Sequence, residues 1–253
     1  MQSLYSGLVG YWNLNETGTG VDRLNMIGSA NPFSPAVATS PGDGVVGSCA
    51  AFASGSHIKQ ASGSVLQGGP KDYTWALWVM FPSVSASVYG ILGKMGATAG
   101  WDEYSLKYTG TGTDRLQFIV YRATDSAQTA QADNFGSISA QTGKWLFVCA
   151  WYDNAGLTVN IEVNLSTTNS TSLAGAAQAA TTNTVTAVGA EDATGANFMN
   201  GSVDELGRWD RVLTRQERTW LYNNGRGRTY PFIGGYSNTT SRRMRSRRMQ
   251  GML

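Results

Sequence analysis

The sequence predicts an all-β protein, on three observations. Apolar and polar residues alternate with period two in several segments, which is the pattern of strands in a sheet. The 253 residues include 31 glycines, as a chain with many turns requires, and only residues 214–224 have convincing helical character. All-β sandwiches of 200 residues or more often fold as one unit, so the length is compatible with a single domain.

The strand pattern differs between segments. In residues 74–81 both faces are apolar, with Trp75, Leu77 and Val79 on one and Ala76 and Trp78 on the other, which predicts a central strand. Residues 116–121 and 157–163 alternate more clearly and are expected to be half solvated, with hairpin turns at 109–114 and 153–156. Residues 28–48, 122–142 and 165–184 have little apolar periodicity and are interpreted as long loops with short edge strands.

The helix at 214–224 has a recognisable start. Thr214 as N-cap can accept a hydrogen bond from the amide of Glu217, whose carboxylate can accept one from the Thr214 amide, which makes a capping box. Gly225 is the expected stop.

Several motifs together resemble one family. The closing segment reads Gly201-Ser-Val-Asp-Glu205, Leu213-Thr-Arg-Gln-Glu217 and Leu221-Tyr-Asn-Asn-Gly225. It resembles the end of laminin-G-like (LamG) jelly rolls in the concanavalin-A-like lectin/glucanase superfamily, of the kind found in phage and bacterial surface proteins. Residues 7–16, 21–25, 74–81 and 143–153 resemble the family's first strand, the loop after it and two core strands. The resemblance implies a two-sheet antiparallel jelly-roll sandwich with one short C-terminal helix, over a domain of residues 1–235.

The resemblance also implies a candidate Ca²⁺ site, since relatives often hold this ion with Asp, Asn and carbonyl oxygens. By position the matching residues are Asp22, Asn25 and Asp204. The match is incomplete because the family's Asp-x-x-Gly-Asn loop lacks its glycine here and carries Arg23. The alternative is that Asp22 and Asp204 accept backbone or Arg hydrogen bonds that tie the first loop to the last strand.

Catalysis is not expected. Glycoside hydrolases of the superfamily need two facing carboxylates, and the acidic pairs at 102–103, 191–192 and 204–205 are adjacent, so they would point to opposite faces of a strand. His57 is the single histidine and is expected to be an ordinary strand residue. The sequence contains no phosphate loop, dinucleotide fingerprint or zinc spacing. Polysaccharide hydrolysis is the third-ranked alternative.

Glycan binding would use an aromatic ring in a polar setting. Trp101 is the best candidate because it lies between Gly100 and Asp102 rather than in an apolar strand, and Tyr121, Asp125 and Tyr89 are further candidates.

The charge is unevenly distributed. The tail of residues 236–253 carries five arginines and no acid, so it has a charge of +5, whereas the remaining 14 basic and 17 acidic residues give −3. Such a tail can anchor the protein to another subunit or stay solvated. The candidate anchoring residues are Arg242, Arg243, Arg245, Arg247 and Arg248.

Two functions follow as hypotheses. The first is a virion surface or capsid decoration protein, made in a host cytoplasm, whose basic tail binds other subunits of a large assembly. No signal peptide is recognised, and Cys49 and Cys149 are expected to be buried thiols rather than a disulfide. The second is a carbohydrate-binding, lectin-like module that is extracellular or on a cell surface. Neither a membrane span nor a nucleic-acid partner is expected.

Overall fold

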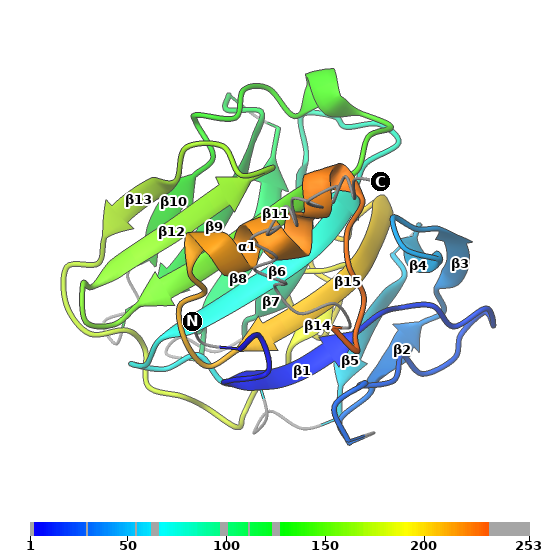
Figure 1. Cartoon of the computed structure of the whole chain (residues 1–253), viewed down its shortest axis with the longest axis horizontal. Helices are drawn as coiled ribbons and strands as arrows, with labels where there is room; N and C mark the ends of the chain where they lie inside the picture. Colours follow the sequence, from blue (N-terminus) through cyan, green and yellow to red (C-terminus); the bar gives the residue numbers. More distant parts are fainter. Residues whose placement is uncertain are drawn as a thin grey trace, which may run out of the picture.

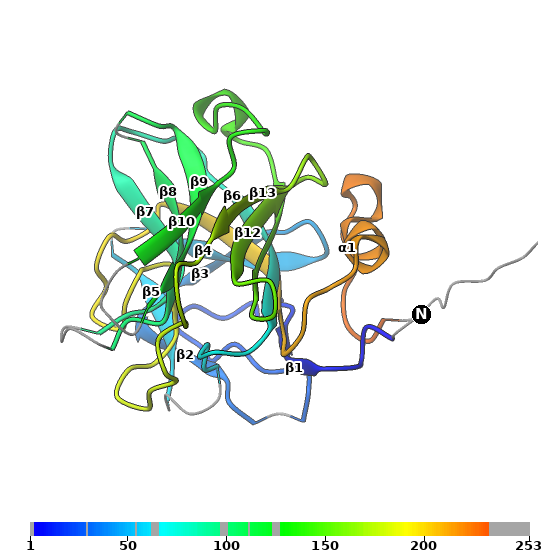
Figure 2. The same cartoon turned by 90° about the vertical axis from the view of Figure 1, so that its left-hand side faces the viewer.

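The computed structural model describes residues 3–28, 30–53, 55–61, 66–96, 101–110, 112–122 and 127–232. Within these ranges the chain forms two stacked sheets and one α-helix outside them (Figures 1 and 2). All the paired strands are antiparallel. The all-β class and the two-sheet sandwich are therefore confirmed.

We call the two layers sheet A and sheet B. Sheet A has the order β13 (Asn169–Ser172), β12 (Thr158–Val163), β11 (Leu146–Asp153), β6 (Tyr73–Met80), β15 (Gly201–Trp209), β4 (Ser48–Phe52) and β3 (Ser40–Asp43), and β1 (Leu8–Trp12) also pairs with β15. Sheet B has the order β10 (Ala127–Gln131), β9 (Arg115–Tyr121), β8 (Tyr104–Thr109), β7 (Val88–Lys94), β14 (Ala187–Val188), β5 (His57–Gln60) and β2 (Phe33–Val37). The helices are α1 (Arg215–Tyr222) and the short 3₁₀ turns η1 (Ser139–Gln141) and η2 (Asn223–Gly225).

The low-periodicity segments provide the sheet edges. Strands β2 and β3 come from residues 28–48, β10 from 122–142 and β13 from 165–184, and each lies at the end of its sheet. The expectation of long loops with short edge strands is thus confirmed. Edge strands need little apolar periodicity because they bury less side-chain area than central ones.

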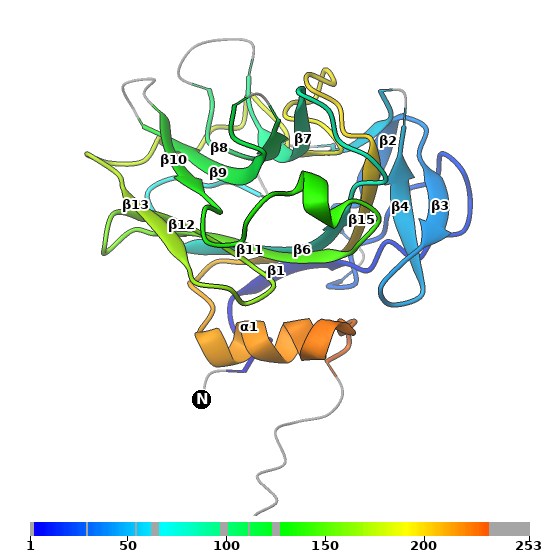
Figure 3. The ribbon, with the colours of Figure 1, turned by 90° about the horizontal axis from the view of Figure 1, so that it is seen from above.

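Two apolar clusters flank sheet A. Strand β6 lies between β11 and β15, as its two apolar faces predict. Trp75, Leu77 and Val79 belong to the core between the sheets, whereas Ala76 and Trp78 belong to a second cluster under α1. Figure 3 shows α1 along the face of sheet A that is turned away from sheet B.

Helix α1 explains one wrong expectation. Strand β12 was expected to be half solvated, but Asn160 and Glu162 on its outer side are 5% and 1% exposed. The Glu162 carboxylate accepts hydrogen bonds from Arg218 at 3.1 Å and Arg215 at 3.4 Å, both on α1. A strand with a polar outer side can therefore be buried when a helix supplies matching cations.

The predicted capping box of α1 is present. The Thr214 hydroxyl accepts from the Glu217 amide, and the Thr214 amide donates to Glu217 Oε2 at 2.8 Å. The end of the helix differs from the prediction, since Asn223 takes the left-handed conformation at the C-cap with a φ of 48°. Gly225, with a φ of 83°, follows within η2.

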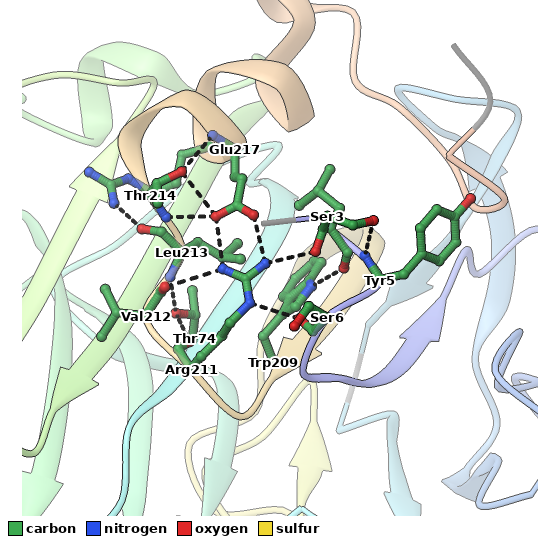
Figure 4. A network of polar contacts seen from close by, with 12 residues as sticks. Ser3, Tyr5, Ser6, Thr74, Trp209, Arg211, Val212, Leu213, Thr214 and Glu217 are labelled. Atoms are coloured by element: carbon green, nitrogen blue, oxygen red, sulfur yellow. Dashed lines mark hydrogen bonds and ion pairs between the residues drawn. The ribbon is translucent and has the colours of Figure 1, made fainter. Parts of the chain in front are cut away.

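Arg211 closes the domain where its two ends meet (Figure 4). Its guanidinium donates to the carbonyl oxygens of Ser6 at 2.7 Å and Ser3 at 3.2 Å, and to both oxygens of Glu217 at 2.6 and 2.8 Å. Trp209 Nε1 donates to the Leu4 carbonyl oxygen at 2.8 Å beside it. Arg211 therefore joins the N-terminal segment to α1, and Trp209 joins the same segment to β15.

Both cysteines are free and buried, so the expectation of two buried thiols is confirmed. Burial raises the pKa of the thiols of Cys49 and Cys149. No helix among the described residues is long and apolar enough to span a membrane.

Candidate functional site

The outer face of sheet B carries polar side chains by strict alternation. On β8 the side chains of Tyr104, Leu106 and Tyr108 enter the core, so those of Ser105 and Lys107 point outward. Sheet A is covered by α1, whereas within the described ranges no α-helix lies over sheet B (Figure 3). The outer face of sheet B is therefore where we place the candidate site.

A loop of residues 189–199 lies directly over this face. A Cβ atom on Gly93 would stand 2.0 Å from the Glu191 carbonyl oxygen, and one on Gly90 would stand 2.4 Å from the Glu191 amide nitrogen. Only glycine allows so close a contact between β7 and the loop. The carboxylate of Asp192 accepts from the amides of Thr194 and Ala196 at 2.8 and 3.0 Å, which fixes the turn.

Glu191 is the centre of a polar network on the sheet. Its side chain is 5% exposed and accepts from Ser105 Oγ and Lys107 Nζ, each at 2.9 Å, and from the side-chain Nδ2 of Asn197. A buried carboxylate needs such partners because desolvation of an unpaired charge is costly. The network attaches the loop to β8 and gives the site a rigid polar floor.

Trp101 and Tyr121 lie at the adjoining end of the sheet. The Trp101 carbonyl oxygen accepts from Thr184 Oγ1 at 3.4 Å, and the Tyr121 hydroxyl donates to Met95 Sδ at 3.8 Å. The next amide after Met95, that of Gly96, donates to Asp102 Oδ1 at 2.9 Å. The end of β7 thus brings these two predicted residues into one region.

Tyr121 lies close enough to the Glu191 network for its carboxylate to affect the Tyr121 hydroxyl. Burial raises the pKa of Tyr121, and the nearby carboxylates of Asp102 and Glu191 raise it further. Both Trp101 and Tyr121 are partly exposed. The third predicted glycan-binding residue, Asp125, lies outside the described residues.

A buried ion pair supports the Trp101 end from beneath. Lys94 Nζ lies 2.5 Å from Glu103 Oε1, and both side chains are 0% exposed. Glu103 also accepts from the amides of Gly68 at 2.5 Å and Thr181 at 2.8 Å, while Lys94 donates to the Thr181 carbonyl oxygen at 2.6 Å. Burial lowers the pKa of Lys94, against the opposing effect of Glu103. The ion pair holds the loops that contain Gly68 and Thr181 next to two strand ends, the end of β7 before Trp101 and the start of β8 after it.

The family follows from the match of the sequence to a family model. Residues 52–217 match the laminin G-type model of the concanavalin A-like lectin/glucanases superfamily. The chain belongs to this superfamily. The two-sheet antiparallel sandwich described above is consistent with the fold of this superfamily.

Several solved structures have a fold similar to that of this chain. Domain 4 of AbnA, an extracellular arabinanase from Geobacillus stearothermophilus, in complex with arabinotriose, has a TM-score of 0.61 and 18% identity over 85% of this chain and 97% of its own. The binding domain of Paraclostridial Mosquitocidal Protein 1 has a TM-score of 0.66 and 12% identity over 87% of this chain and 52% of its own.

The botulinum neurotoxin serotype D ligand binding domain, in complex with N-acetylneuraminic acid, has a TM-score of 0.62 and 11% identity over 86% of this chain and 51% of its own. The chain thus spans about half the length of these two domains. A search of curated protein sequences finds no match.

Two of the three residues predicted to bind Ca²⁺ accept backbone hydrogen bonds. Asn25 Oδ1 accepts from the amides of Tyr11 at 3.1 Å and Ile27 at 3.0 Å. Asp204 Oδ2 accepts from Val45 at 2.7 Å and Val46 at 3.1 Å. Among the described residues no three His, Cys, Asp or Glu side chains are grouped to hold a metal.

Asp22, the third of these residues, is exposed. The alternative gave Asp22 and Asp204 a hydrogen-bonding role between the first loop and the last strand. Asp204 does accept backbone hydrogen bonds, but they come from the β3–β4 turn rather than the first loop, and Asn25 rather than Asp22 accepts backbone hydrogen bonds in that loop. The oxygens of Asn25 and Asp204 therefore do not fit a cation as they stand, and Ca²⁺ binding stays a prediction.

Two other sequence predictions concern single sites. His57 is the first residue of β5, with its ring nitrogens 3.2 and 3.3 Å from the carbonyl oxygens of Gly55 and Ala193, so it is a strand residue as expected. The five tail arginines lie outside the described residues, and their anchoring role stays a prediction.

Glu191 and Lys107 were not found from the sequence. The acidic pair at 191–192 was considered only as a strand pair, but both residues lie in the loop after β14. A signal was present in Val88-Tyr-Gly-Ile-Leu-Gly-Lys94, because two glycines inside a strand indicate that another backbone comes close.

Proposed function

We propose that this protein is a non-enzymatic carbohydrate-binding module of the lectin type. The observation that carries the proposal is the outer face of sheet B, where Trp101 and Tyr121 adjoin a polar floor of Glu191, Lys107 and Asn197. An aromatic ring beside fixed polar groups suits a sugar, which has an apolar ring face and hydroxyl groups at its edge. The arabinotriose and N-acetylneuraminic acid complexes of structural neighbours support the same ligand class.

Binding without catalysis is part of the proposal. Glu191 is paired with Lys107, and Glu103 is paired with Lys94. Acids that are paired in this way are committed to positioning backbone and side chains. A glycosidase would instead need one of two facing carboxyl groups to supply a proton.

A glycan array with the full chain tests the proposal. The array should include arabinan fragments and sialylated oligosaccharides, and bound glycans are then titrated by calorimetry. We expect Trp101→Ala to weaken binding about tenfold, since one lost stacking contact is worth roughly that factor.

The matched control is Trp220→Ala, which removes an indole from α1 on the opposite side of the domain. It should leave the affinity within about twofold, the change expected of a residue outside the site. Absence of any bound glycan at millimolar concentration would contradict the proposal, as would a larger loss from Trp220→Ala than from Trp101→Ala.

The role as a virion surface component remains a hypothesis from the sequence. The comparisons favour the carbohydrate-binding alternative, and the tail on which the anchoring depends lies outside the described residues. Deleting residues 236–253 should abolish incorporation into a particle if the tail is an anchor, and normal incorporation of the truncated protein would refute that role. The sugar affinity should be unchanged in either case.

A further inference from the structure

A third aromatic residue, Phe198, lies at the far end of the 189–199 loop, on the other side of the Glu191 network from Trp101 and Tyr121. The side chain of Phe198 is 48% exposed. It lines a groove of about 480 Å³ together with Ser87, Val88, Tyr89 and Asn197. This volume lies within the range of small-molecule sites, so the groove has room for a sugar ring.

The backbone behind Phe198 is fixed. Phe198 forms a parallel bridge with Gly90 on β7, and the Gly90 amide donates to the Asn197 carbonyl oxygen at 2.6 Å. The Met199 amide donates to the Gly189 carbonyl oxygen at 2.8 Å, which closes the base of the loop. An exposed ring on a fixed backbone loses little entropy when a ligand stacks on it.

The groove suits a neutral ligand with both apolar and hydroxyl surfaces. Tyr89 stacks on Tyr108 with ring centroids 5.7 Å apart, and its hydroxyl lies 2.9 Å from Ser85 Oγ. The residues that line the groove supply two aromatic rings, the hydroxyl groups of Ser87 and Tyr89 and the side-chain amide of Asn197, and none of them is charged. This chemistry favours a saccharide over a phosphate or a charged peptide.

Strand register places this groove away from Trp101 but on the same sheet. Phe198 adjoins Gly90, which pairs with Lys107 on β8, whereas the Tyr121 amide bonds to the Glu103 carbonyl oxygen. Lys107 and Glu103 are four residues apart along the chain, and with three strand spacings this separates the two regions by roughly 20 Å. The Glu191 network lies between them, because Glu191 bonds to both Lys107 and Asn197.

We infer that the groove at Phe198 is a second saccharide subsite, and that the ligand is an oligosaccharide chain that extends across sheet B from Trp101 to Phe198. This inference rests on the proposed function and specifies its ligand class. A single sugar or a disaccharide would occupy one end only, whereas a longer chain would contact both rings.

The test compares affinities across chain length on the glycan array and by calorimetry, with the full-length wild type and two variants. For the wild type we expect the affinity to rise from the disaccharide to longer chains of the same linkage. Phe198→Ala should remove this rise and weaken binding of the longest chain about five- to tenfold, with the disaccharide affected less than twofold. The control is Leu24→Ala, which removes a 50% exposed apolar side chain elsewhere and should change neither value.

The outcomes separate the two levels of the proposal. If no glycan of any length binds, the proposed function fails and this inference fails with it. If glycans bind in a manner that depends on Trp101 while Phe198→Ala keeps the full rise with chain length, the second subsite is refuted and the proposed function stands. A loss confined to long chains supports both.

Discussion

Replacing Arg211 by methionine should destabilise the domain strongly. The side chain is 12% exposed and its partner Glu217 is 1% exposed, so Arg211→Met leaves a buried carboxylate without its cation. It also removes the donors to the carbonyl oxygens of Ser3 and Ser6. Breaking one side of a buried ion pair typically costs about 3–5 kcal/mol, and we expect a loss of this size in the free energy of unfolding at pH 7.

The pH dependence gives this prediction a second readout. Burial alone would raise the pKa of Glu217, but hydrogen bonds from Arg211 and Thr214 hold it below its usual value. The stabilisation from a depressed carboxyl pKa is present above the unfolded-state pKa and is lost as the pH falls through the folded-state pKa. The cost of Arg211→Met should therefore shrink in acid.

The assay is urea unfolding followed by tryptophan fluorescence, in a double-mutant cycle with Glu217→Gln. We expect Arg211→Met to cost less in the Glu217→Gln background, because the unpaired charge is then absent, with a coupling of about 1–3 kcal/mol. A cost below about 1 kcal/mol for Arg211→Met alone, or no coupling between the two sites, would refute the reasoning.

Three further predictions concern stability. Burial raises the pKa of Glu205 from 4.5 to about 8, so the folded state holds a proton that the unfolded chain releases, and the free energy of unfolding should fall as the pH rises from about 4.5 to about 8. Glu205→Gln should reduce that slope in a pH series of urea melts, the remainder coming from Asp204, whose pKa burial raises to about 7, and an unchanged slope would contradict the assignment. Gly93→Ala should cost about 1–3 kcal/mol because its Cβ meets the backbone of Glu191, and a melt like that of the wild type would show that the loop can move aside. Thr214→Ala should cost about 1 kcal/mol through loss of the helix cap, as measured by thermal unfolding, and no change would mean that packing alone holds α1.

The features that were predictable from the sequence are the local ones. The capping box at Thr214 depends on residues three apart, and the double-faced apolar pattern of 74–81 is enough to place β6 in the centre of its sheet. The end of α1 was less determined, because Asn223 and Gly225 both tolerate the left-handed conformation.

The features that were missed depend on contacts between distant segments. Arg211 donates to Ser3, which is more than 200 residues away in the sequence, and nothing in the sequence around Arg211 indicates that it joins distant segments. The loop that contains Glu191 contacts Gly90 and Gly93, which lie about 100 residues earlier in the sequence. The glycines in the strand therefore indicate a close backbone contact but not which segment makes it. For the same reason Trp101 could be chosen as a candidate from its polar surroundings, while the floor beside it could not.

The most direct test of glycan binding on sheet B is the location of a bound ligand. Amide chemical shifts of the full chain should be recorded by NMR while the tightest oligosaccharide from the array is added. We predict that the perturbed amides cluster at Trp101, Tyr121, Lys107, Asn197 and Phe198. Perturbations centred instead on α1 and the outer face of sheet A would contradict the account.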